Sequence, residues 1–496
     1  MEAFAHALID GINGILWNYV LIALLFGAGA WFTLRFALIQ LRALPLGIRT
    51  VGSKGEPGSI TSFQAFATGL ASRVGTGNIV GVAVALTVGG PGAIFWMWVT
   101  ALLGMSSAFV EATLAQIFKV SHHDGTYRGG PAYYIRIGLR SRGFGVLFSL
   151  SLILAFGFVF NAVQANSIAE ALHTSFGWSR AAVGVGLVAL AAPIIFGGIR
   201  RIAHVAQVIV PLMAIGYVAL AAYAVATHAT MLPDVIALIV KSAFGFGPAA
   251  GGLTGYAVSQ AAAVGVKRGL FSNEAGMGSA PNAAATASTR HPVTQGLIQM
   301  LGVFVDTFVI CTATAFMILL SGQYEIGTGM EGGALTQRAI SSFVGDWGGT
   351  YMAVAIFFLA FSSVIGNYAY AEGNVEFITK RRRAVVIFRL AVLGMVMFGS
   401  VGKLPLVWAM ADTSMGLMAL INLIAILALG KHAHAAWHDY RKQRAAGVAE
   451  PVFTRKTIPA LDKVLPSDVW GEHGPVPRVA RAARELSHVE GERVAS

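Results

Sequence analysis

Charged residues are scarce in this chain of 496 residues, and cysteine is almost absent. Asp, Glu, Lys and Arg together make up 12% of the sequence, whereas hydrophobic residues make up 56%. A soluble globular protein carries about 25% charged residues, so water is not the solvent for most of this surface. The low charge therefore argues against a soluble protein and indicates one embedded in a lipid bilayer.

The single cysteine, Cys311, excludes an internal disulfide framework and a thiolate metal cluster. It lies in an apolar stretch, where a small packing residue is the ordinary interpretation. The histidines lack the H-E-x-x-H spacing, no serine stands in a G-x-S-x-G context, and no G-x-x-x-x-G-K-[ST] loop occurs. These absences argue against an enzyme and against ATP-driven transport, and we expect no cofactor.

Long apolar stretches dominate the sequence instead. Each stretch is about 20 residues long, which is the length that a helix needs to cross about 30 Å of hydrocarbon. Polar and apolar residues do not alternate within them as they do in barrel strands. We therefore predict an all-α polytopic membrane protein with about eleven transmembrane helices. The expected intervals are 17–39, 62–89, 91–118, 145–172, 181–198, 202–227, 251–289, 294–320, 350–378, 384–401 and 404–430.

The formal net charge of +12 follows membrane topology and does not indicate nucleic-acid binding. Lys and Arg concentrate in alternate loops, for example around Arg140 and Arg382, whereas the loop 321–349 has few. The positive-inside rule then places the N-terminus outside and the C-terminus in the cytoplasm. We expect the protein to lie in the inner membrane of a bacterial cell. We expect a transmembrane domain over 1–430 and a cytoplasmic tail over 431–496, disordered or weakly helical.

Two of the expected spans are interrupted. The second contains Gly75-Thr76-Gly77-Asn78, and the seventh, too long for one crossing, contains Phe271-Ser272-Asn273-Glu274-Ala275-Gly276-Met277-Gly278. Glycine disfavours helix by about 1 kcal/mol and frees backbone groups that bind small ions or a carboxylate. One break in each half predicts a transporter of inverted repeats with a central site. Close helix packing is the alternative role for these glycines.

Polar side chains inside the spans are candidates for function, because each costs free energy in hydrocarbon unless it is satisfied. Asp306 and Glu274 lie deepest. They either couple transport to an ion or form structural salt bridges with Arg73 or Arg268. Three further charges lie near predicted span ends, where structural or interfacial pairing is the expected role: Glu111, Glu372 and Arg389.

At these residues the sequence resembles the alanine or glycine:cation symporter family, also called sodium:alanine symporters. The matching motifs are Val74-Gly75-Thr76-Gly77-Asn78-Ile79, Gly89-Gly90-Pro91-Gly92-Ala93-Ile94-Phe95-Trp96, Gly129-Gly130-Pro131-Ala132-Tyr133-Tyr134 and Gly269-Leu270-Phe271-Ser272-Asn273-Glu274-Ala275-Gly276. The resemblance implies one leading helix followed by ten helices of a LeuT-like five-plus-five inverted repeat.

The resemblance also implies roles for individual residues. Sodium would be held by the carbonyls of Ala71 and Val74 and by the hydroxyls of Ser362 and Ser363. The substrate site would comprise Thr76, Gly77, Asn78, Gln164, Phe271, Asn273 and Asn367. Many family members carry tryptophan where this chain has Asn367, and the smaller polar residue leaves a strict preference for alanine or glycine open.

The expected function is sodium-coupled symport of small neutral amino acids, alanine or glycine, into the cell by alternating access. Its partners would be the amino acid, the co-transported sodium ion and the lipid bilayer, without nucleic acid. Proton coupling through Asp306 or Glu274, and a broader specificity that includes serine or glutamine, remain alternatives. An ion channel is a further alternative, although it predicts a continuous polar stripe, whereas polar residues here concentrate at the breaks.

Overall fold

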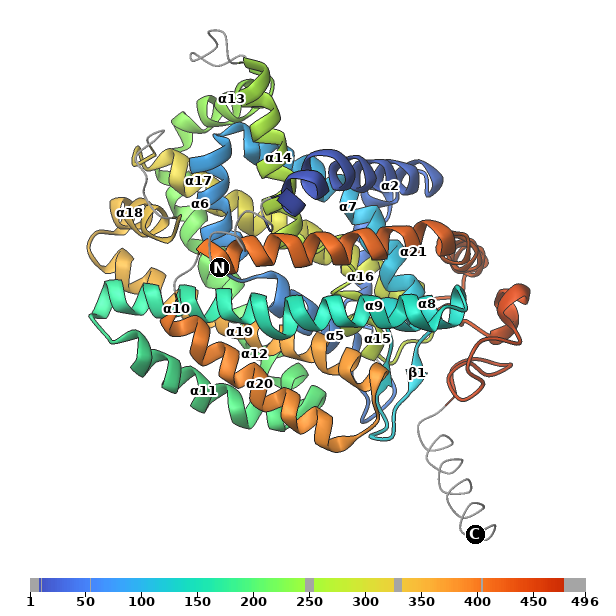
Figure 1. The fold of residues 1–496 in the computed structure, drawn as a ribbon. Coiled ribbons are helices and arrows are strands. Elements are labelled where there is room, and N and C mark those ends of the chain that lie inside the picture. The colour runs from blue at the N-terminus through green and yellow to red at the C-terminus, as the bar shows by residue number, and fades with distance from the viewer. Residues whose placement is uncertain are drawn as a thin grey trace.

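The computed structural model describes residues 9, 11–53, 55–245, 254–324, 332–402 and 405–476. These residues form a bundle of helices (Figure 1), and the strands among them are one antiparallel pair, β1 (Val120–Ser121) and β2 (Tyr127–Arg128). Val120 pairs with Arg128, and Ser121 pairs with Tyr127. The all-helical class expected from the apolar stretches is confirmed.

Helices follow one another along most of the described chain. The first half contains η1 (Leu16–Leu21), α2 (Ile22–Arg35), α3 (Ile39–Arg42), α4 (Leu44–Thr50), α5 (Ser62–Arg73), η2 (Gly77–Gly81), α6 (Val82–Gly89), α7 (Gly92–Ile117), α8 (Pro131–Gly138), α9 (Arg142–Leu152), η3 (Ile153–Val159), α10 (Phe160–Phe176), α11 (Arg180–Phe196), α12 (Gly198–Thr227), η4 (Ala229–Met231) and α13 (Leu232–Ala243). The second half contains α14 (Thr254–Asn273), α15 (Pro281–Thr286), α16 (Val293–Val303), η5 (Phe304–Cys311), α17 (Thr312–Leu320), α18 (Gly332–Val344), α19 (Trp347–Ile378), α20 (Arg382–Val401), α21 (Pro405–Ala445), η6 (Arg455–Thr457) and η7 (Pro459–Leu461).

A helix lies on each of the eleven expected intervals, but not all of them are long enough to count as spans. Among the described residues, eight helices are long and apolar enough to cross a membrane, and the bent pair Ser62–Arg73 with Gly77–Gly89 brings the number to nine. The helix α11 has 17 residues, and the seventh interval is divided between α14 and the short α15. The count of eleven therefore stays a prediction.

Burial separates central helices from helices that face the surroundings. In α7 and α19, 67% of the most apolar window is buried inside the protein, against 22% in α12. The exposed side chains of α12 include Val208, Leu212 and Ile215. Exposure of branched aliphatic side chains along a helix is favourable in lipid and unfavourable in water. The central helices α7, α10 and α19 thus support the interrupted spans, and α12 and α20 present apolar faces outward.

The second span is broken where the sequence predicted. Helix α5 begins with a capping box, in which Gln64 N donates to Thr61 Oγ1 (3.1 Å) and Thr61 N donates to Gln64 Oε1 (3.0 Å). It ends at Arg73, and the chain resumes as a π-helical turn, η2, which leads into α6 at an angle of 50° to α5. The expected break at Gly75-Thr76-Gly77-Asn78 is confirmed.

The seventh span is also discontinuous. Helix α14 ends at Asn273, and α15 starts at Pro281, where a proline is well tolerated in a first helical turn. Between them Glu274, Gly276 and Gly278 have positive φ angles of 57°, 83° and 86°. Left-handed backbone cannot continue an α-helix, so the linker is a loop rather than a kink.

The end of the chain differs from the expected tail. Helix α21 passes Gly430 and ends at Ala445, and the segment 448–476, which we call the C-terminal strap, packs on the helical body. Phe453 N donates to Arg290 O (2.9 Å), and the buried Trp470 donates through Nε1 to Ile117 O (3.1 Å). Disorder or weak helicity is thus wrong for 431–476, because aromatic residues anchor the strap. Residues 477–496 lie outside the described part, and the domain division at 430 stays a prediction.

Candidate functional site

The backbone groups freed at the first break are bound by neutral amide oxygens. Gly75 N donates to Asn78 Oδ1 (3.0 Å), and Thr76 N donates to Gln164 Oε1 (3.1 Å) from α10. Asn78 O in turn accepts a hydrogen bond from Thr314 Oγ1 (2.7 Å). A neutral amide oxygen is a weaker acceptor than a carboxylate. The backbone N–H groups of Gly75 and Thr76 are therefore available to a stronger acceptor.

The two glycines of the break are also needed for close packing. A Cβ atom on Gly75 would lie 2.2 Å from Ser363 Oγ, and one on Gly77 would lie 3.0 Å from Cδ1 of Phe271. Both roles considered from the sequence, breaking the helix and allowing close approach, therefore apply to the same residues. The close approach brings α19 and the end of α14 against the break.

Three of the four expected sodium ligands converge. The hydroxyls of Ser362 and Ser363 on α19 lie 3.3 Å and 3.0 Å from Ala71 O near the end of α5. Val74 follows in an extended conformation (ψ 90°), so its carbonyl leaves the helical ladder. Hydroxyl and carbonyl oxygens are the hard ligands that sodium requires. The sodium roles of these residues stay a prediction.

The expected substrate residues fall into two groups. Thr76, Gly77, Asn78, Gln164 and Phe271 come together at the first break through hydrogen bonds and close packing. The Phe271 ring packs against Phe160 (4.8 Å between centroids) and Trp408 (5.2 Å). The second group, Asn273 and Asn367, makes no hydrogen bond to the first among the described residues.

Asn273 and Asn367 are held by other partners. Asn273 Nδ2 donates to Thr307 Oγ1 (3.2 Å). Asn367 Nδ2 donates to Asn161 Oδ1 (3.2 Å), and Asn367 Oδ1 lies 2.7 Å from Ser72 Oγ. The structure thus places Asn367 in a buried polar cluster beside α5 rather than against the freed amides.

Asp306 connects the two breaks. Its carboxylate accepts hydrogen bonds from Asn78 Nδ2 (2.6 Å) at the first break and from Ser272 Oγ (2.8 Å) at the end of α14. Thr307 Oγ1 is a third donor at 3.0 Å. A buried carboxylate with three donors is well satisfied without an ion pair.

Glu274 is satisfied in a similar way. It accepts from Ser72 Oγ (2.8 Å) and Ser279 Oγ (2.6 Å). Salt bridges of Asp306 or Glu274 with Arg73 or Arg268 were one alternative from the sequence, and they are absent within 4.0 Å among the described residues. Arg268 instead binds Asp412, with Nη2 2.6 Å from Oδ1. The alternative is therefore wrong for Arg268, whereas Arg73 interacts electrostatically with both carboxylates without direct contact.

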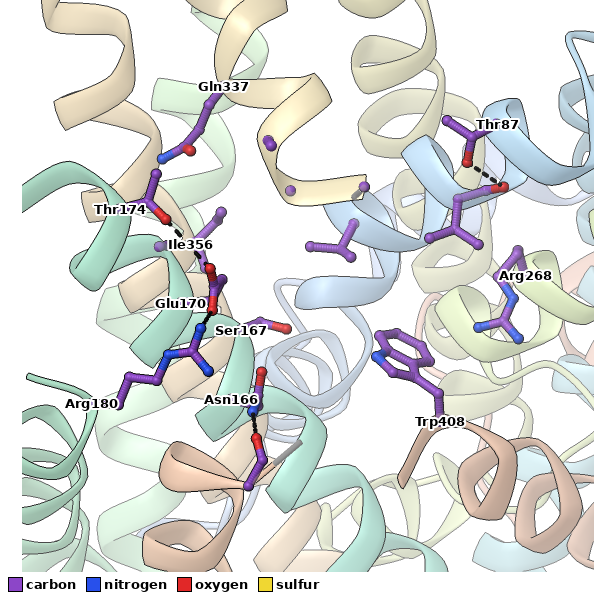
Figure 2. Close-up of a pocket in the computed structure, with 17 residues that line it drawn as sticks. Thr87, Asn166, Ser167, Glu170, Thr174, Arg180, Arg268, Gln337, Ile356 and Trp408 are labelled. Carbon is purple, nitrogen blue, oxygen red and sulfur yellow. Dashed lines mark hydrogen bonds and ion pairs between the residues drawn. The ribbon is translucent and has the colours of Figure 1, made fainter. Parts of the chain in front are cut away.

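A cavity of about 640 Å³ opens beside the first break. Figure 2 shows Asn166, Glu170 and Arg180 on one side and Arg268 and Trp408 on the other. The ion pair of Arg180 with Glu170 lies in the first wall. Since Trp408 also contacts Phe271, an aromatic layer separates the cavity from the break.

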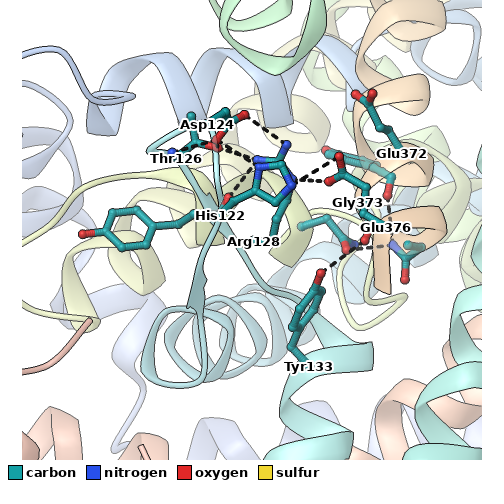
Figure 3. Close-up of polar contacts among 12 residues, drawn as sticks. His122, Asp124, Thr126, Arg128, Tyr133, Glu372, Gly373 and Glu376 are labelled. Carbon is teal, nitrogen blue, oxygen red and sulfur yellow. Dashed lines mark hydrogen bonds and ion pairs between the residues drawn. The ribbon is translucent and has the colours of Figure 1, made fainter. Parts of the chain in front are cut away.

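A polar cluster lies near the end of α19 (Figure 3), where Arg128 of β2 binds Glu376 (Nε to Oε2, 2.6 Å). His122 Nδ1 lies 3.0 Å from Asp124 Oδ1. Although burial alone would raise the pKa of Asp124, the contacts with His122 and Arg128 lower it below its usual range. Ile356 of α19 lines the cavity, about 30 Å along the helix from Glu376, so the cavity and the polar cluster lie far apart along α19.

Comparisons with known proteins identify relatives of this chain. Residues 1–455 match the Sodium:alanine symporter family. A protein of Bacillus subtilis named "Probable sodium/glutamine symporter GlnT" is 48% identical over 92% of this chain and 95% of its own length. "Sodium/alanine symporter AgcS" of Methanococcus maripaludis is 38% identical over 88% of this chain and 98% of its own length.

The chain belongs to the sodium:alanine symporter family. Its fold is also found in a solved structure, "Crystal structure of MhsT in complex with L-phenylalanine", with a TM-score of 0.54 and 12% identity over 75% of this chain and 89% of that one. This likeness supports the LeuT-like fold that the motifs implied. The protein is thus a multi-pass membrane transporter.

Several residues near the breaks have contacts that were not predicted from the sequence. Glu111, expected to pair near a span end, is fully buried and accepts from Gly276 N (3.2 Å) and Asn422 Nδ2 (2.7 Å). Cys311, expected only to pack, lies 3.3 Å from Asn78 Nδ2. One signal was visible for Asn422, an amide within an apolar span. The π-helical turns η2 and η5, which hold Asn78 and Asp306, had no such signal, although such turns often lie at functional sites.

Proposed function

We propose that this symporter carries a small neutral amino acid into the cell together with sodium. The observation that carries the proposal is the pairing of Thr76 N with the neutral Gln164 oxygen, directly beside the cluster of Ala71 O with the two serine hydroxyls. A substrate carboxylate displaces Gln164 from this amide because the charge-assisted hydrogen bond is stronger. The adjacent oxygen cluster then holds sodium, which links ion and substrate.

Alternating access follows from the open and closed ends of the bundle. With the N-terminus outside, the cavity faces the exterior, and the cluster of Arg128 with Glu376 closes the cytoplasmic side. Sodium holds α5 against α19, the amino acid completes the site, and the two repeats then reorient around it. An ion that enters down the membrane potential supplies about 2.3 kcal/mol per 100 mV.

Alanine and glycine are the first substrates in this proposal, and glutamine is the second candidate. The observation that favours glutamine is a buried cluster of the Asn161 and Asn367 amides with the Ser72 hydroxyl. These groups can donate hydrogen bonds to a side-chain amide and accept them from it. A relative with 48% identity is named as a probable glutamine symporter. Asp306 and Glu274 are the residues through which proton coupling would act.

Uptake of labelled alanine into proteoliposomes tests the proposal. We expect accumulation with an inward sodium gradient and little uptake when potassium replaces sodium at the same pH. Unlabelled glycine, serine and glutamine are added as competitors, and the strongest competitor identifies the substrate class. Accumulation driven by a proton gradient without sodium would assign the coupling to protons, and uptake indifferent to both gradients contradicts symport.

A further inference from the structure

A seam between α5 and α16 is lined by polar groups along its length. Gln295, Gln299 and Gly302 lie on one face of α16, at positions i, i+4 and i+7. This face is turned toward α5: a Cβ on Gly69 would lie 3.1 Å from Gln299 Oε1, and one on Gly302 would lie 2.3 Å from Arg73 Nη1. Arg73 Nη1 also donates to Gln299 O (3.4 Å).

The polar atoms of this seam are largely without partners. Within the described residues, both side-chain polar atoms of Gln295, both of Gln299, and Nε and Nη2 of Arg73 have no hydrogen-bond partner. All three side chains are at least 98% buried. The contrast with Asp306 and Glu274 is direct, because those carboxylates are fully hydrogen-bonded in the same interior.

Unpaired buried polar groups destabilise the conformation that contains them. If the interface served only packing, leucine at positions 295 and 299 would fill a similar space without the free-energy cost of unpaired polar groups. The penalty disappears if water or substrate reaches these groups in another conformation. Helix α5 is able to move separately, since its connection to α6 is the break that follows Arg73.

We propose that the seam between α5 and α16 opens in the inward-facing conformation and is the route by which the amino acid leaves the site. Arg73, one residue before the break, receives the substrate carboxylate. The amides of Gln299 and Gln295, which offer both donors and acceptors, then pass the zwitterion toward the start of α16. In the proposed orientation that end is cytoplasmic. The inference rests on the proposed symport and adds the exit-path residues to it.

Thiol labelling of Gln299→Cys tests whether the seam opens. Inside-out membrane vesicles are treated with a membrane-impermeant maleimide, with Ile298→Cys as the matched control because Ile298 is the buried neighbour on α16. The native chain, whose one cysteine is the buried Cys311, gives the background rate of maleimide labelling. Without sodium we expect Gln299→Cys to react about tenfold faster than Ile298→Cys, as a transiently hydrated site does, and sodium to slow it. Equal rates for the two variants overturn the proposal.

Gln299→Leu provides a second test that does not depend on the cysteine variant folding. Removal of the unpaired amide stabilises the closed seam, so we expect a melting temperature higher by about 2 °C together with slower amino-acid exchange. Gln299→Asn, which keeps the amide, should restore exchange. A variant with raised stability and undiminished exchange contradicts the exit-path role.

The two proposals fail in different ways. Labelling reports opening of the seam without any transported amino acid, so it remains readable if alanine is not a substrate. Transport without preferential labelling of Gln299→Cys refutes the seam alone. Labelling without sodium-driven uptake of any competitor refutes the symport and leaves the seam as a hydrated path.

Discussion

The two broken spans differ in what binds their freed amides. At the first break Thr76 N is bound by the neutral Gln164, whereas at the second Gly276 N is bound by the carboxylate of Glu111. Asn422 adds a further bond from its Nδ2 to Gly276 O (2.9 Å). The freed amide of the second break is therefore bound by a carboxylate, whereas that of the first break is bound by a neutral group and the nearby Asp306 binds the Asn78 side chain instead.

This difference assigns the substrate carboxylate to the first break. A carboxylate that approaches Gly276 would meet Glu111, and the repulsion between two buried like charges is strongly unfavourable. At Thr76 the incoming carboxylate replaces a neutral acceptor and gains a stronger bond. This contrast supports the proposed binding of the substrate at the first break.

The largest effect is expected from Gln164→Glu, which makes the first break resemble the second. Two unit charges 4 Å apart repel by about 4 kcal/mol at an effective dielectric constant of 20, so KM for the amino acid should rise more than about 100-fold. Measurement of KM in proteoliposomes checks this. Gln164→Leu, which removes the acceptor without adding charge, should raise KM much less. Equal KM values for both variants would remove the electrostatic explanation.

The next effect is on stability. Glu111→Ala removes the acceptor of Gly276 N and one of the two acceptors of Asn422 Nδ2, and an unsatisfied buried group costs about 1–3 kcal/mol. The melting temperature of the purified protein in detergent should fall clearly. Glu170→Ala, at the ion pair in the cavity wall, is the control and should change stability by about 1 kcal/mol or less. A fall no larger than that of the control would show that the second break does not depend on Glu111.

A smaller effect is expected for sodium. Ser363→Ala removes one hard oxygen beside Ala71 O and should raise the sodium concentration for half-maximal uptake about tenfold, the equivalent of about 1.4 kcal/mol. Ser342→Ala, whose hydroxyl bonds only its own helix at Ala339 O, is the control. Unchanged sodium dependence in Ser363→Ala would place the ion elsewhere.

The smallest effect lies outside both breaks, at Asp124. Because the pKa of this carboxylate is lowered in the folded protein, its contribution to stability is complete above the unfolded pKa of about 4 and is lost as the pH falls further. Melting temperatures of the native chain and of Asp124→Asn should differ at pH 6, and the difference should begin to narrow as the pH falls from 4 to 3. A difference that grows with acid would have the wrong sign for a lowered pKa.

Much of the fold was readable from the sequence because the bilayer penalises polar groups so strongly. The apolar stretches predicted helices on all eleven intervals, and the glycines at 75 and 77 and the polar residues at 271–278 marked both breaks. The α21 helix was predicted too short because the charged residues after 430 resembled a solvated tail. Trp437 and Tyr440 continue its packed face.

The site was predictable only in part, because its contacts join distant positions. Ser363 and Ala71 are 292 residues apart, and their proximity came from family resemblance. The pairing of Arg268 with Asp412 rather than with a buried carboxylate depends on which helices lie side by side. Nothing in the local sequence distinguishes these partners.

The sequence by itself determined that the chain is helical, that it lies in a membrane and that two spans are broken, since these properties depend on local composition and on the cost of polar groups in lipid. The tertiary structure alone decided which side chain binds the freed amide at each break. Thr76 N and Gly276 N are equivalent donors until the fold brings Gln164 to one and Glu111 to the other.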